Sequence, residues 1–153
     1  MGGCCHSDLA ALTLENTPEL EFDGQSFETK VLEVYDGDTV TVAVRIAGDG
    51  AYRRTRCRLA GIDAAEVRTR NSLEKAVGRD AKEWLSDLVL NKVVYLQCGK
   101  WDKFGRLLGT LYLTKRDVAI GASVNAQLVR MGYAYTYGGE KKRAFGEWHQ
   151  ISK

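Results

Sequence analysis

Residues 35–70 read YDGDTVTVAVRIAGDGAYRRTRCRLAGIDAAEVRTR, and this stretch decides the fold. Asp36-Gly37 is a strong signal for a hairpin turn. The residues after it alternate valine or isoleucine with threonine, alanine or arginine, which is typical of a strand with one buried face. Gly48-Asp49-Gly50 marks another turn, and a strand is predicted over residues 52–59. With a further strand expected over residues 27–35, the stretch predicts three consecutive strands joined by tight turns.

The rest of the chain adds strands and helices. Helical spacing of apolar residues predicts a helix over residues 77–90, and two further strands are expected over residues 93–98 and 106–113. Ser123 is a predicted N-cap for a helix ending at Met131, and a short amphipathic helix is expected near the C-terminus. Five short strands with a helix inserted after the third predict an α+β fold. The expected architecture is a five-stranded OB-type β-barrel with further short helices, which commonly binds oligonucleotides.

Composition divides the chain into an acidic arm and a basic domain. At 153 residues the chain fits one domain with a full core, and no apolar run reaches the roughly 18 residues that span a bilayer. Residues 1–28 hold six of the 20 acidic side chains and no lysine or arginine, which leaves 22 basic against 14 acidic residues elsewhere. We expect a flexible arm over residues 1–26 and a barrel domain over residues 27–153. A cationic domain suits a polyanionic partner, although a solvated arm on a mildly basic surface is the simpler interpretation.

The N-terminus permits two interpretations. Gly2 is a candidate for myristoylation and Cys4 or Cys5 for palmitoylation, but His6 stands where the acylation pattern requires serine or threonine. The alternative is a floppy terminus with incidental cysteines. Without a recognisable secretory signal, we expect a cytoplasmic protein with reduced thiols and no disulfide framework. Membrane association would then depend on acylation of this segment alone.

Five polar residues combine into a candidate active site. Asp38 and Asp63 each lie next to a strand end, so a barrel can bring both carboxylates to one hard cation. Glu66 is three residues beyond Asp63 and is long enough to take a proton from a metal-bound water. Arg58 and Arg106 carry planar guanidinium groups that match the oxygens of a phosphate. A cation, a base and two fixed positive groups are what water needs to attack a phosphodiester.

These residues lie in three segments, 36–40, 58–66 and 102–106, with a helix predicted between the second and third. Together the segments resemble the signature of the staphylococcal nuclease (thermonuclease) family, whose members are calcium-dependent nucleases built on a five-stranded barrel. The similarity in pattern runs over about residues 31–137. No single segment is specific, but three of them in this order are a strong signal.

The resemblance implies a Ca²⁺-dependent endonuclease that hydrolyses DNA and RNA at the P–O5′ bond and leaves 3′-phosphate ends. Its partners would be single-stranded DNA and RNA, and no obligate protein partner is predicted. The implied site comprises the metal ligands Asp38, Asp63 and Ala64 (through its carbonyl), the catalytic residues Arg58, Glu66 and Arg106, and the substrate-binding residues Lys103, Phe104, Tyr135 and Tyr137.

Two departures from the family pattern bear on activity. Members usually carry threonine or a similar residue and then proline between the metal aspartate and the glutamate, whereas this chain has Ala64 and Ala65. Loss of the proline predicts a looser loop, a less well placed Glu66 and lower activity. The alternative function is a non-catalytic OB-fold module that only binds nucleic acid, with or without a membrane tether. Such modules typically lose the acidic ligands or arginines, all five of which this chain keeps.

Overall fold

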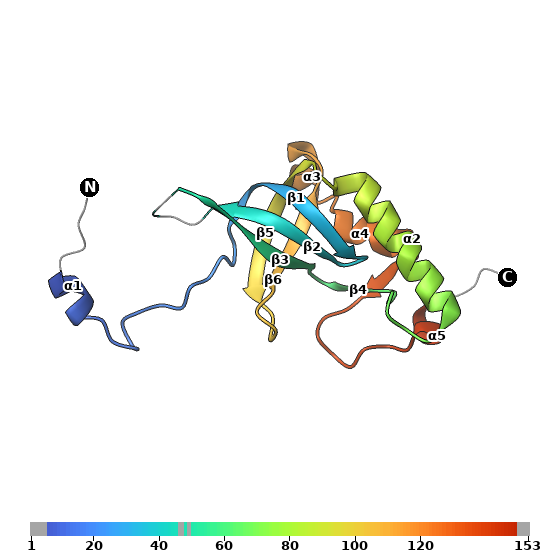
Figure 1. The fold of residues 1–153 in the computed structure, drawn as a ribbon, viewed down its shortest axis with the longest axis horizontal. Helices are drawn as coiled ribbons and strands as arrows, with labels where there is room; N and C mark the ends of the chain where they lie inside the picture. Colours follow the sequence, from blue (N-terminus) through green and yellow to red (C-terminus); the bar gives the residue numbers. More distant parts are fainter. Residues whose placement is uncertain (1–5, 46–47, 49, 150–153) are drawn as a thin grey trace.

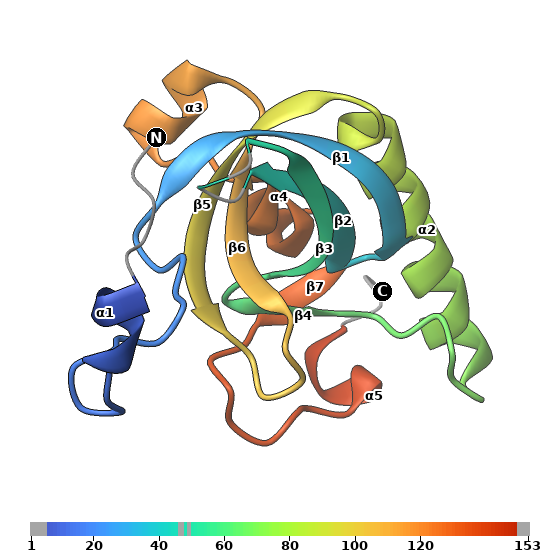
Figure 2. The same cartoon turned by 60° about the vertical axis from the view of Figure 1, so that its left-hand side comes forward.

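A computed structural model describes residues 6–45, 48 and 50–149, and within them five strands close into a barrel. Their order around the barrel is β1-β2-β3-β6-β5, as Figure 2 shows. Neighbouring strands are antiparallel except for β3 and β6, which are parallel. The barrel consists of β1 (Ser26–Asp36), β2 (Thr39–Arg45), β3 (Tyr52–Leu59), β5 (Val93–Trp101) and β6 (Leu107–Tyr112). The predicted α+β, OB-type barrel is therefore confirmed.

The longest helix, α2 (Ser72–Val89), lies against the outside of the barrel next to β1 (Figure 1). It begins five residues earlier than predicted because the side chain of Asn71 accepts hydrogen bonds from the N–H groups of Leu73 and Glu74 and so caps the helix. The other described helices are short: α1 (His6–Ala10), α3 (Lys115–Ile120), α4 (Val124–Arg130) and α5 (Phe145–Trp148).

A small second sheet was not expected from the sequence. Residues after Leu59 were predicted to form a loop, but β4 (Ile62–Ala64) pairs antiparallel with β7 (Ala134–Thr136). This pair could not be predicted, because strands of three residues are too short to show an alternating hydrophobic pattern and the two strands lie far apart in the sequence. This pairing sets Asp63 opposite Tyr135.

The barrel core is aliphatic and closely packed. At Gly109 in β6, a Cβ atom would meet the Cδ1 atom of Leu96 at 2.5 Å and the Sγ atom of Cys57 at 2.7 Å, so a larger residue would have to displace these core side chains. Cys57 and Cys98 are both buried free thiols. Burial raises the pKa of Cys57 to about 12, which keeps this thiol protonated and unreactive.

The segment just before β1 contacts the barrel. The indole N–H of Trp101 donates to the carbonyl of Leu20 at 3.1 Å, and the rings of Phe22 and Trp101 meet edge to face. Figure 1 shows α1 lying apart from the barrel. The candidate acylation residues Gly2, Cys4 and Cys5 lie outside the described residues, and their modification stays a prediction. Within the described ranges, no helix is both long enough and apolar enough to cross a bilayer.

Candidate active site

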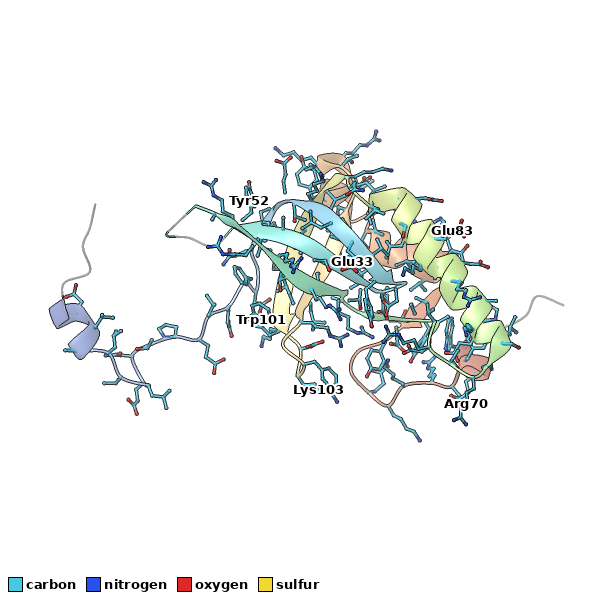
Figure 3. The ribbon with its side chains drawn as sticks, viewed as in Figure 1. Glu33, Tyr52, Arg70, Glu83, Trp101 and Lys103 are labelled. Atoms are coloured by element: carbon cyan, nitrogen blue, oxygen red, sulfur yellow. The ribbon has the colours of Figure 1, made fainter. Side chains whose placement is uncertain are left out.

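One mouth of the barrel holds a cavity of about 810 Å³. It lies where the β1–β2 turn, the segment after β3 and the β5–β6 loop come together, and Figure 3 shows Lys103 at the tip of that last loop. All three sequence segments that were singled out therefore reach one place. Of the predicted site residues, the cavity is lined by Asp38, Arg58, Ala64, Glu66, Lys103, Phe104, Arg106 and Tyr137. Asp63 and Tyr135 are not part of the lining, but both are buried and bonded to residues near it.

Arg58 lies between the two aspartates. One of its terminal nitrogens, Nη2, is 2.6 Å from Oδ1 of Asp63 and 3.4 Å from Oδ2 of Asp38. The two carboxylate oxygens therefore lie no more than 6.0 Å apart, the sum of those distances. The other terminal nitrogen donates to the carbonyl of Ile62 at 2.9 Å. All three charged residues are buried, so this ion pair group is held in a fixed geometry.

The β1–β2 turn positions Asp38. The hydroxyl of Thr39 donates to its Oδ1 atom and the N–H of Ala64 to its Oδ2 atom, both at 3.0 Å. The backbone carbonyl of Asp38 also accepts a 2.7 Å hydrogen bond from the N–H of Leu59. These contacts tie the turn to the segment that carries Asp63, which is how two distant parts of the sequence share one site.

Asp36 is an additional acidic residue in the cavity that sequence reasoning treated only as a turn former. Burial and the nearby negative charge of Asp38 raise its pKa to about 6. Its Oδ1 atom accepts a hydrogen bond from the N–H of Asp38 at 3.2 Å. Asp36 and Asp38 thus place two carboxyl groups side by side at the cavity wall, where a cation would relieve their mutual repulsion.

Lys142 is a further residue of the site that the sequence did not indicate. Its ammonium is 2.8 Å from Oδ1 of Asp63 and 3.5 Å from Oε1 of Glu66. Burial disfavours the charge on Lys142, but the hydrogen bond and charge of Asp63, helped by the charge of Glu66, outweigh it and raise the pKa of the lysine. Lys142 follows a glycine pair and belongs to no motif, so only the fold could reveal it.

Helix α2 holds the loop that carries Glu66. The carboxylate of Glu74 accepts hydrogen bonds from the N–H of Glu66 at 3.3 Å and from the hydroxyl of Thr69 at 2.9 Å. Gly78 packs so closely on this loop that a Cβ atom there would lie 2.8 Å from the carbonyl oxygen of Ala65. The loop was expected to be loose because Ala65 replaces a proline. Contacts from α2 restrain it instead.

Arg106 is oriented by its own hairpin loop. Its Nε–H donates to Oδ2 of Asp102 at 2.6 Å, while the N–H groups of Arg106 and Phe104 donate to Oδ1 of Asp102. The hydrogen bonds from these groups outweigh burial and lower the pKa of Asp102, which therefore stays ionised. Phe104 is exposed, and both Arg106 and Lys103 lie over its ring. Because Asp102 binds the Nε–H of Arg106, the terminal N–H groups of this arginine are the ones that a phosphate could engage.

The two tyrosines occupy different environments. Tyr137 lines the cavity, and the guanidinium of Arg58 lies 5.8 Å from its ring centroid. Tyr135 is buried, donates its hydroxyl to Oδ2 of Asp63 at 3.0 Å and accepts from the N–H of Arg143. Burial and the charge of Asp63 raise the pKa of Tyr135. Tyr135 thus holds the aspartate, a contact made across β4 and β7.

No preformed metal cage is present among the described residues, since no three His, Cys, Asp or Glu side chains have that geometry. What the mouth offers is a pair of buried carboxylates, an exposed glutamate and two arginines. These features define an OB-type barrel with a cavity suited to a phosphate ester and a cation.

Comparison with known proteins identifies the family. The family described as "Staphylococcal nuclease homologue" matches residues 56–153. The chain is 32% identical over 108 residues to an uncharacterized endonuclease of Haemophilus influenzae, covering 71% of this chain and 51% of that protein. It is 32% identical over 115 residues to a micrococcal nuclease of Shigella flexneri, covering 72% and 59%. A similar match to protein ParB of Escherichia coli is 30% identical over 132 residues, covering 84% and 65%.

The chain therefore belongs to the staphylococcal nuclease family, and the resemblance seen in its three sequence segments is confirmed. In these comparisons it spans only about half to two thirds of the length of the relatives it matches.

Proposed function

We propose that this chain is a calcium-dependent nuclease that hydrolyses phosphodiester bonds of DNA and RNA. Cleavage would break the P–O5′ bond and leave a 3′-phosphate. The observation that carries the proposal is the convergence of Asp38, Asp63, Glu66, Arg58 and Arg106 at one mouth of the barrel. Relatives named endonuclease and micrococcal nuclease support the same chemistry.

The residues present fit a calcium ion. Asp38 and Asp63 are hard oxygen ligands that already face a common positive charge, the Nη2 atom of Arg58. A second cation, the ammonium of Lys142, contacts Asp63 from the cavity side. Ca²⁺ prefers carboxylate, carbonyl and water oxygens and tolerates an irregular set of them. Asp38, Asp63 and the carbonyl of Ala64 would hold the ion, and water would complete its shell.

Each protein group then has a defined task in hydrolysis. When bound, the calcium ion supplies a positive charge that orients water and neutralises a phosphate oxygen. Glu66 accepts a proton from the attacking water, whose oxygen forms the new bond to phosphorus. Arg58 and Arg106 donate hydrogen bonds to the phosphate as it becomes five-coordinate. The P–O5′ bond breaks, and the departing 5′ oxygen takes up a proton from solvent water to become a hydroxyl.

The structure as it stands shows the site with its charges paired internally. Arg58 contacts both aspartates, and Lys142 contacts Asp63 and Glu66. Substrate and metal would replace these contacts, because the two non-bridging oxygens of a phosphodiester offer Arg58 a bidentate partner and a metal ion would satisfy both carboxylates. Binding of either one therefore assists binding of the other.

A cleavage assay tests the proposal. Labelled single-stranded DNA and RNA are incubated with the protein in calcium, in magnesium and in chelator, and the ends of the products are identified. We expect cleavage in calcium with 3′-phosphate ends, little in magnesium, which demands near-octahedral geometry, and none in chelator. Tight binding without cleavage in any metal would instead indicate a nucleic-acid-binding module.

A further inference from the structure

Outside the cavity, two arginines from different elements stack on one tyrosine. The guanidinium carbon of Arg56 in β3 lies 4.3 Å from the ring centroid of Tyr35 in β1. That of Arg68, in the segment between β4 and α2, lies 5.2 Å from the same centroid. The tyrosine is half-buried, whereas both arginines are exposed. A run of arginines in this strand suggested only a solvated face, but the stacking fixes where these two guanidinium groups lie.

Neither of these two positive charges forms an ion pair with another described residue. Between the described residues, neither Arg56 nor Arg68 has a carboxylate oxygen within 4.0 Å, in contrast to Arg58 and Arg106. On the same face of the sheet, Glu33 accepts a hydrogen bond from the hydroxyl of Thr41 instead. Two like charges held on one ring repel each other, and an external anion bound at their N–H groups would relieve that repulsion. Each guanidinium keeps its N–H edge for such an anion.

The pair adjoins the cleavage cavity. Tyr35 directly precedes Asp36, and Arg68 follows Glu66 by two residues; Asp36 and Glu66 both line the cavity. On its other side, Arg56 borders a second hollow of about 480 Å³ on the outer face of β1–β3, which Arg54 also lines. Glu33, which also lines this hollow, is labelled in Figure 3. Positive side chains thus continue from the cavity rim along β3.

We propose that Arg56, Arg68 and Tyr35 form a second phosphate-binding subsite, which holds the backbone of a nucleic-acid strand next to the phosphate being cleaved. The inference deepens the proposed function and rests on it. A tyrosine that fixes both guanidinium groups reduces the conformational entropy lost when a phosphate binds. Because the contacts are to phosphate, the subsite favours longer strands over short ones without selecting a base sequence.

Binding of oligonucleotides in chelator tests this without any cleavage. Fluorescence anisotropy is measured over a range of salt concentrations for single-stranded oligo(dT) of about 12 nucleotides and for a dinucleotide. The double variant Arg56→Gln/Arg68→Gln removes both charges, and Tyr35→Leu removes the ring that fixes them. The matched control is Arg116→Gln/Arg130→Gln, because these exposed arginines of α3 and α4 likewise lack an ion pair among the described residues.

The double variant is expected to bind the long oligonucleotide roughly tenfold more weakly at low salt. The slope of log binding constant against log salt concentration should become shallower by about 0.7–1.4, as expected for the loss of one or two phosphate contacts. Tyr35→Leu should weaken binding in the same direction, and dinucleotide binding should not change in either variant. The control should lose much less affinity, although its net charge falls equally.

Several results would overturn the subsite. Equal losses of affinity in the double variant and in the control would show that only net charge matters. Unchanged binding of the long oligonucleotide by the double variant would exclude the subsite. The same variants are also tested for binding to phosphatidylserine vesicles. If the double variant loses vesicle binding but keeps oligonucleotide binding, the arginines belong to a membrane-binding surface instead. If the length-dependent loss appears but the wild type cleaves nothing in calcium, the nuclease proposal fails and the subsite stands.

Discussion

Arg58 gives the site its central contact, because a single nitrogen reaches both Asp38 and Asp63. Two buried carboxylates so near each other would repel without a cation between or beside them. In this structure protein side chains supply that charge. The same arrangement explains how the fold tolerates a cluster of acidic groups.

Asp36 should limit stability above its pKa. Its pKa is raised from 3.8 to about 6, so the protonated carboxyl stabilises the fold fully below pH 3.8 and this contribution is lost as the pH rises through 6. Asp36→Asn should therefore raise the free energy of unfolding in chelator by about 1–2 kcal/mol at neutral pH, after allowance for solvent screening. Urea unfolding measured across that pH range checks this.

The gain from Asp36→Asn should shrink steadily toward pH 3.8, where the wild-type carboxyl is itself protonated. Asp87→Asn, at an exposed position of α2, is the control and should change stability little at any pH. A gain that does not depend on pH, or none at neutral pH, would contradict the assignment of Asp36 as a destabilising buried charge.

In the proposed calcium site, Lys142 would compete with the ion for Asp63, so removing the charge of this lysine should strengthen calcium binding. Lys142→Met is expected to lower the calcium dissociation constant by about threefold to tenfold, a modest effect because the side chain is about half exposed. Isothermal titration calorimetry of the nucleic-acid-free protein measures it.

Lys141→Met removes the same charge from a neighbouring exposed lysine that has no ion pair with any described residue. That control should leave the dissociation constant nearly unchanged. Weaker calcium binding in Lys142→Met would show that the lysine supports the metal site and does not compete with it.

Helix α2 restrains the loop that carries Glu66. Glu74 accepts hydrogen bonds from that loop, and Gly78 allows the helix backbone to approach it closely. A proline would restrain the loop through its own backbone, whereas here the restraint comes from a packed helix. Changes in α2 are therefore expected to alter catalysis.

Gly78→Ala tests whether the close approach of α2 positions this loop. Alanine favours helix formation, but its Cβ atom would lie 2.8 Å from the carbonyl oxygen of Ala65 and 2.9 Å from the carbonyl carbon of Glu66, so the loop must move. We expect the cleavage rate to fall by roughly tenfold or more, with stability lowered by about 1–3 kcal/mol. Single-turnover cleavage and chemical unfolding measure the two effects.

Gly146→Ala is the matched control, because a Cβ atom at this helical position of α5 meets nothing within 4 Å. It should leave both the rate and the stability close to wild type. An unchanged cleavage rate in Gly78→Ala would show that α2 does not set the position of Glu66.

Locally encoded elements could be predicted from the sequence. The Asp36-Gly37 turn and the strand over residues 52–59 were confirmed, because a turn dipeptide and a period of two depend on neighbouring residues alone. Helix α3 was missed although Thr114 and Asp117 form a capping box at its start, a signal that the sequence does carry. The pairing of β4 with β7 had no such signal.

The features of the site that could not be predicted are contacts between residues far apart in the sequence. The hydroxyl of Tyr135 reaches Asp63 across 72 residues of sequence, and Lys142 reaches the same aspartate from a segment without a motif. Asp38, Asp63 and the two arginines were indicated by their residue types and their positions at strand ends, and the family resemblance linked the three segments that carry them. Their convergence at one cavity is a property of the closed barrel as a whole.

The molecule as a whole is therefore a barrel with one charged mouth, and the central claim is that this mouth hydrolyses phosphodiesters with calcium and Glu66. The most direct measurement compares calcium-dependent cleavage of single-stranded DNA by the wild type and by Glu66→Gln, with calcium binding measured for both. We expect calcium binding in both proteins, with cleavage reduced by about a hundredfold or more in the variant. Equal cleavage by the two proteins, or none by the calcium-bound wild type, would contradict the account.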